Sequence, residues 1–170
     1  MAEPALPGGL RIAAPDPARA IRATVVAIIV VSAFITVLDA AVFRETLKPD
    51  YLAHATAPLW PRTALACLGS AMEELIFRLA AMTALIAMPG LIGKKAGAIW
   101  FVFAIVAAQF FNVGELVLAD PLYATLRYWL VGCVWGWLYW RHGFVSALLG
   151  HGLCHLLLDP ALRTALLAGS

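Results

Sequence analysis

The chain has 170 residues, of which 63% are hydrophobic and only 13% charged, and its mean hydropathy is +0.88. Soluble domains are close to half apolar and a quarter charged, so this composition excludes a water-soluble fold and predicts an integral membrane protein. The net charge is +2 without a basic block, which argues against nucleic acid as a partner.

Residues 1–20 are predicted to form a flexible N-terminal tail, because proline and glycine recur through them and forbid a regular helix. The apolar run that follows begins near Ile21. No short basic start with a small-residue cleavage site accompanies it, so the first span is expected to stay as a membrane anchor. Residues 21–170 are then predicted to form a single transmembrane domain.

About five spans of roughly 20 residues fit into this domain, and together they predict an all-α polytopic transmembrane helical bundle. The spans are expected at residues 21–43, 59–88, 96–118, 122–140 and 144–167. The connection 44–56 is interpreted as a loop too polar for hydrocarbon. The basic residues of the tail, of the loop after the second span and of the last hairpin favour a cytoplasmic amino terminus, and the inner membrane if the source is bacterial.

Three charged residues lie well inside the second predicted span. Each ionised group costs about 2.5 to 3.5 kcal/mol at the centre of a membrane helix on insertion scales, so their presence needs a reason. Glu74 and Arg78 are four residues apart and share a helical face, where they can pair. Such a pair alone is consistent with a structural salt bridge. Glu73 points about 100° away and lacks that local partner, which favours a general base.

The last predicted span contains a second polar set, His151, His155 and Asp159, at successive i, i+4 positions on one face. Imidazoles placed in this way can hold a metal, shuttle a proton or donate hydrogen bonds to a developing oxyanion. The alternative is that both histidines are ordinary core residues with satisfied hydrogen bonds.

The third predicted span adds the amides Gln109 and Asn112, which taken alone are typical of hydrogen bonds between membrane helices. Asp39, near the end of the first span, is interpreted as an interfacial residue.

Residues 73–78, with the sequence EELIFR, resemble the EExxxR motif of the CPBP family, which includes the CAAX prenyl proteases and the bacteriocin-processing enzymes also called Abi proteins. Residues 127–151 strengthen the resemblance with a glycine-spaced helix, a tight turn and a histidine-bearing last helix. The resemblance covers roughly residues 59–159 and implies a CAAX-protease-like bundle.

The resemblance also implies roles for individual residues. Glu73 activates a water that attacks the scissile carbonyl, Glu74 assists, and Arg78 fixes the two carboxylates. His151 and His155 match the family's HxxxN motif, with histidine in place of asparagine, and stabilise the oxyanion or ligate a metal.

The middle motif of the family, FxxxH, has no histidine in this chain. By spacing, Gln109 takes the place of that histidine, with Asn112 one turn further on. A glutamine can orient a water but cannot take its proton. Either Glu73 works with His151 or His155 instead, or the chain is an altered or inactive relative.

We therefore expect a glutamic-type intramembrane endopeptidase that hydrolyses a peptide bond in a membrane-proximal segment of a protein or peptide. Its expected partners are membrane lipid and that substrate, and this mechanism requires no cofactor. A divalent metal such as zinc, held by Glu73, His151 and His155, stays open as an alternative. The competing functions are an inactive immunity or scaffold protein of the same fold and a protein that translocates protons or metal ions.

Overall fold

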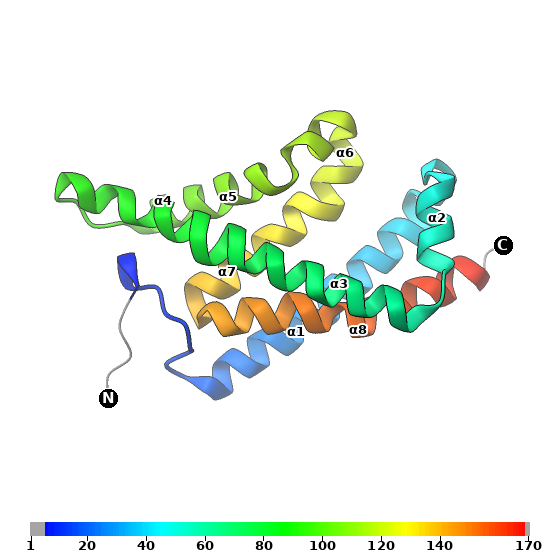
Figure 1. Ribbon diagram of the computed structural model, residues 1–170, viewed down its shortest axis with the longest axis horizontal. Helices are drawn as coiled ribbons and strands as arrows, with labels where there is room; N and C mark the ends of the chain where they lie inside the picture. The colour runs from blue at the N-terminus through cyan, green and yellow to red at the C-terminus, as the bar shows by residue number, and fades with distance from the viewer. Residues whose placement is uncertain (1–5, 169–170) are drawn as a thin grey trace.

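The computed structural model describes residues 6–168, and this part of the chain consists of helices and connecting segments without a strand (Figure 1). The elements are η1 (Pro7–Gly9), α1 (Pro17–Val37), η2 (Leu38–Val42), η3 (Arg44–Thr46), α2 (Pro49–Thr56), α3 (Leu59–Glu73), η4 (Glu74–Met82), α4 (Thr83–Ala87), η5 (Met88–Ile92), α5 (Ala98–Ala119), α6 (Pro121–Ala124), η6 (Thr125–Leu130), α7 (Val131–His142) and α8 (Phe144–Ala168). The segments η2, η4 and η6 are π-helical and continue the helices beside them. The all-α prediction is confirmed.

Four helical stretches are long and apolar enough to cross a membrane. They are Pro17–Val42, Leu59–Ile92, Ala98–Ala119 and Phe144–Ala168, and they match four of the five predicted spans. The remaining predicted span, residues 122–140, is also one continuous helix, formed by α6, η6 and α7. Its high content of Trp and Tyr lowers its hydropathy, which explains why it does not stand out like the other four. The chain is an integral membrane protein.

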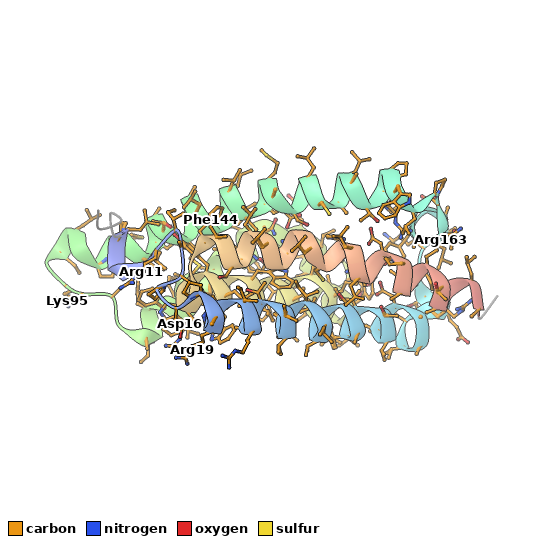
Figure 2. All side chains as sticks on the ribbon, turned by 90° about the horizontal axis from the view of Figure 1, so that it is seen from below. Arg11, Asp16, Arg19, Lys95, Phe144 and Arg163 are labelled. Atoms are coloured by element: carbon orange, nitrogen blue, oxygen red, sulfur yellow. The ribbon has the colours of Figure 1, made fainter. Side chains whose placement is uncertain are left out.

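Helix α8 lies at the centre of the bundle, where it packs against α1, α3 and α7. Figure 2 shows α8 between α3 and α1. Small buried residues of α8, among them Ala147 and Gly150, allow this close approach. A Cβ at Gly150 would already lie 3.1 Å from the side chains of Leu138 and Trp135 on α7. This packing places the histidine face of α8 inside the bundle.

Residues 6–16 pack against the bundle, which differs from the flexible tail that the sequence predicts. Leu10 is 1% exposed and belongs to the hydrophobic core. The backbone N–H groups of Phe144 and Val145 donate to the carbonyls of Arg11 and Ile12, each at 2.9 Å. These N–H groups belong to the first turn of α8, where no intrahelical partner exists. The segment therefore caps the central helix; the first five residues of the predicted tail lie outside the described residues.

One predicted boundary and one predicted loop also differ from the structure. Helix α1 begins at Pro17, before Ile21, because Asp16 caps it by accepting a hydrogen bond from the backbone N–H of Arg19 at 3.0 Å. The predicted loop 44–56 contains helix α2, which proline at its first position initiates.

Asp39 is fully buried, with 0% exposure, so its interpretation as an interfacial residue is wrong. Its carboxylate accepts hydrogen bonds from the hydroxyls of Tyr51 and Tyr123, and the Nε atom of Arg127 lies 2.9 Å away as an ion pair without an aligned hydrogen bond. Arg127 also donates to the Tyr51 hydroxyl at 2.9 Å. Burial raises the pKa of Tyr51 to about 12, so its hydroxyl stays protonated at neutral pH. This cluster ties η2, α2, α6 and η6 together.

We predict that Asp39→Asn lowers the free energy of unfolding by about 3 kcal/mol or more, because it leaves the Arg127 guanidinium buried without a counter-charge. Unfolding of the purified protein in mixed micelles measures the change. Glu45→Gln, at an exposed carboxylate near the same end, is the control and should stay within about 0.5 kcal/mol of the wild type. Equal unfolding free energies for the two variants would contradict the role given to Asp39.

Candidate active site

The two adjacent acids of the second span stand where α3 passes into η4. Glu73 is the last residue of α3, and Glu74 is the first of the π-helical segment, in which each turn holds more residues than in an α-helix. Glu74 is 0% exposed, whereas Glu73 is half-buried and faces a cavity. The predicted divergence of the two side chains is present in the structure.

This cavity has a volume of about 400 Å³ and lies between α1, α3, η4, α5, η6, α7 and α8. Its wall combines aliphatic side chains with a polar set that charged and amide residues dominate. The polar and titratable lining residues are Ser70, Glu73, Arg78, Gln109, Asn112, Arg127, Tyr128, His151, Cys154 and His155. A space with this lining, enclosed by apolar helices, can hold water and the polar backbone of a peptide.

Glu74 is engaged by two partners and is not among the residues that line the cavity. Its Oε1 atom lies 2.9 Å from Nδ1 of His151, and its Oε2 atom lies 3.6 Å from Nε of Arg78. The predicted pairing of Glu74 with Arg78 is therefore present. The contact with His151 joins η4 to α8 and leaves Nε2 of that ring without a partner among residues 6–168.

Arg78 is 2% exposed, and its guanidinium is held by more than its acid. The Nη2 group donates to Oε1 of Gln109 and to the carbonyl of Gly132, each at 2.7 Å. Gln109 in turn donates from Nε2 to the carbonyl of Tyr128 at 3.2 Å. Both ends of the Gln109 amide are thus used to connect α5 with η4 and η6, while the bond from Arg78 to Gly132 adds α7. Within the described part of the chain, the Nη1 group of Arg78 has no hydrogen-bond partner.

Glu73 has one amide partner. Asn112, one turn beyond Gln109 on α5, donates from Nδ2 to Oε2 of Glu73 at 3.0 Å. This single bond fixes the carboxylate and leaves Oε1 available to the cavity, which both residues line.

The polar face of α8 forms a stacked column, as its spacing predicts. The rings of His151 and His155 stack with centroids 5.9 Å apart, and Nδ1 of His155 lies 3.3 Å from Oδ1 of Asp159. Thr63 donates to Oδ2 of Asp159 at 2.7 Å, and Nε of Arg62 lies 3.7 Å from the same atom. Asp159 therefore orients His155 and connects α8 to α3.

Sequence reasoning missed Trp135, whose indole stacks on His151 with ring centroids 5.4 Å apart and planes at 15°. A signal was present in the sequence. Trp135 and His151 are equally far from Gly143, so a symmetric hairpin at that glycine brings the two residues opposite each other.

The proposed metal ligands do not form a preformed site. No group of three or more His, Cys, Asp or Glu side chains between residues 6 and 168 is arranged to hold a metal ion. Glu73 is bound by Asn112, and each histidine directs its Nδ1 to a different carboxylate.

Fold and site together define a polytopic helical membrane protein with an acid, two imidazoles and a guanidinium beside one internal cavity. Residues 55–157, more than half of the chain, match the family model described as type II CAAX prenyl endopeptidase Rce1-like. The chain belongs to this family of intramembrane proteases, as the resemblance of residues 73–78 indicates. A search of curated proteins and a search of solved structures each found no match.

We predict that Gly132→Ala lowers the free energy of unfolding by about 1 to 3 kcal/mol. A Cβ at this position would overlap the carboxamide of Gln109 and displace it from Arg78. Gly152→Ala is the matched control, because a Cβ there meets nothing within 4 Å and the helix gains up to about 1 kcal/mol. Unfolding in mixed micelles measures the free energy of unfolding of both variants. A Gly132→Ala value equal to that of the wild type would show that the Gln109 amide can move aside without cost.

Proposed function

We propose that the protein is an active intramembrane endopeptidase in which Glu73 is the general base. The observation that carries this proposal is that the two adjacent acids have different surroundings. Glu74 is occupied by Arg78 and His151, whereas Glu73 lines the cavity with one carboxylate oxygen available. Membership of a peptidase family supports the reaction class.

In the proposed reaction, Oε1 of Glu73 removes a proton from a water in the cavity, and the resulting hydroxide attacks the scissile carbonyl. The tetrahedral oxyanion accepts hydrogen bonds from the Nε2–H groups of His151 and His155. Their Nδ1 atoms remain with Glu74 and Asp159, which hold both rings in place. When the C–N bond breaks, the proton held by Glu73 passes to the leaving amine nitrogen, and the carboxylate is restored.

In the proposed reaction, the amide residues of α5 do not contact the substrate but position the charged side chains beside it. Gln109 stands where the family has a histidine, but its contacts make it a positioning residue for Arg78. Asn112 is the residue of α5 that touches the base itself. We propose that Glu73 carries the proton transfer in this protein without a middle-motif imidazole, and that no cofactor takes part.

The proposed substrate is a protein or peptide with a membrane-proximal cleavage site, which enters the cavity between the helices. The proposed orientation has a cytoplasmic amino terminus, in the inner membrane if the source is bacterial. Figure 2 supports this orientation, because Arg11, Arg19 and Lys95 lie toward one end of the bundle and Arg163 toward the other.

A second candidate is an inactive scaffold or immunity protein of the same family. The observation that favours it is Gln109, which stands where the family has a proton-accepting histidine. Its amide cannot accept a proton and is used in hydrogen bonds to Arg78 and to the carbonyl of Tyr128.

One experiment decides between the two candidates. We predict that expression of the wild type creates new amino termini in membrane proteins, and that Glu73→Gln abolishes them with a loss of at least 100-fold in rate on the purified substrate. Mass spectrometry of protein termini from the host membranes measures the effect. Glu115→Gln, at an exposed carboxylate of α5, removes the same charge outside the cavity and should retain full cleavage. No cleavage by the wild type would favour the scaffold.

We also predict that Asn112→Leu lowers kcat about tenfold, because the lost hydrogen bond leaves the base free to rotate away from the water. KM should change little, since Asn112 is proposed to position the base rather than to bind substrate. Steady-state cleavage of the substrate found above gives both constants. A rise in KM at constant kcat would assign Asn112 to substrate binding instead.

A further inference from the structure

We propose that a pocket between α1 and α7, at the end of the bundle where α1 begins, binds the headgroup of an anionic phospholipid. The pocket has a volume of about 430 Å³ and shares no lining residue with the catalytic cavity. Its lining combines basic and apolar side chains: Arg19, Arg22, Ala23, Val26, Trp137, Trp140, Arg141 and His142.

The basic residues of this pocket lack counter-charges. Arg19, Arg22 and Arg141 are exposed, no acid lines the pocket, and none of the three guanidinium groups forms an ion pair within residues 6–168. The acid nearest to them in sequence, Asp16, caps α1 by accepting the backbone N–H of Arg19. Arg141 lies over the ring of Trp140, with its Cζ atom 5.4 Å from the centroid.

Three other arginines are paired with acids, whereas Arg44 and Arg163 donate to backbone carbonyls. Arg62, Arg78 and Arg127 each lie within 4 Å of a carboxylate. Three unpaired guanidinium groups that converge from two helices therefore leave a positive pocket which an anionic group can neutralise.

The apolar part of the pocket identifies the anion as part of a lipid. Val26 is 58% exposed and lies on the membrane-spanning part of α1, and Trp137 is 42% exposed on α7. Trp side chains beside basic residues are typical of the membrane interface. A phosphate held by the arginines would allow an acyl chain to run along Val26 and Trp137, whereas a free phosphate ion would leave this apolar surface uncovered. Basic pockets between membrane helices are known to bind anionic headgroups.

Binding at this pocket would stabilise the catalytic domain, because it joins two helices that both pack against α8. We therefore expect an anionic lipid to raise the unfolding temperature, and a zwitterionic lipid with the same acyl chains to have no comparable effect.

The test uses the purified full chain in detergent, titrated with phosphatidylglycerol or phosphatidylcholine, with binding followed by native mass spectrometry and by thermal unfolding. The double variant Arg22→Gln/Arg141→Gln removes two pocket charges from two helices. Its matched control, Lys94→Gln/Lys95→Gln, removes two exposed charges that lie outside the pocket; Figure 2 shows Lys95 toward the same end of the bundle. Unfolding without added lipid checks that both variants fold.

We expect phosphatidylglycerol to bind the wild type and the lysine control alike, and the arginine variant at least tenfold more weakly. Equal weakening of both variants would overturn the proposal, because it would indicate attraction to the whole basic end. Unchanged binding by the arginine variant, or equal binding of phosphatidylcholine, would also overturn it. Stabilisation by inorganic phosphate alone, at the level reached with the lipid, would identify an ion site and refute a lipid site.

Discussion

Arg78 places a guanidinium at 2% exposure inside a helix that crosses the membrane, and the helices around it are arranged to satisfy that charge. An arginine at such a depth is costly unless acids, amides and carbonyls surround it. Glu74 supplies the counter-charge, while Gln109 and the carbonyl of Gly132 accept its hydrogen bonds. Through these partners one side chain brings together η4, α5 and α7, and the contact of Glu74 with His151 adds α8.

The same arrangement explains why two adjacent acids are present. One carboxylate is needed for the buried guanidinium, and Glu74 fills that role outside the cavity wall. Glu73 then remains with a single amide contact beside a space large enough for water and a peptide segment. A structural ion pair thus leaves a second, less constrained acid at a cavity that two imidazoles also line. An acid and imidazoles are groups that can serve as general base and hydrogen-bond donors in peptide hydrolysis.

Local spacing was enough to predict the features that lie within one helix. The i, i+4 relation of Glu74 and Arg78 and the column of His151, His155 and Asp159 depend only on helical periodicity, and both are present. Four of the spans followed from the length and hydropathy of continuous segments, which are also local properties of the sequence.

Contacts between distant segments could not be predicted in this way. The partners of Asp39 come from α2, α6 and η6, which are distant from it in the sequence. Its position near a helix end therefore suggested a residue at the membrane interface, whereas the structure has it in a buried cluster. The sequence of residues 6–16, rich in proline and glycine, likewise gave no indication that its carbonyls cap α8. The use of both ends of Gln109 depends on the close approach of Gly132, which only the packing of α5 against α7 shows.

The claim that Glu74 is the counter-charge of Arg78 and that Glu73 is left free is tested most directly by one comparison. It measures the unfolding free energies of Glu73→Gln and Glu74→Gln in mixed micelles. We predict that Glu74→Gln lowers the unfolding free energy by about 3 kcal/mol or more, because Arg78 loses its counter-charge. Glu73→Gln should stay within about 1 kcal/mol of the wild type, since only one hydrogen bond from Asn112 is altered. An equal loss for both variants, or a larger loss for Glu73→Gln, would contradict the assignment of Glu73 as the acid left free for chemistry.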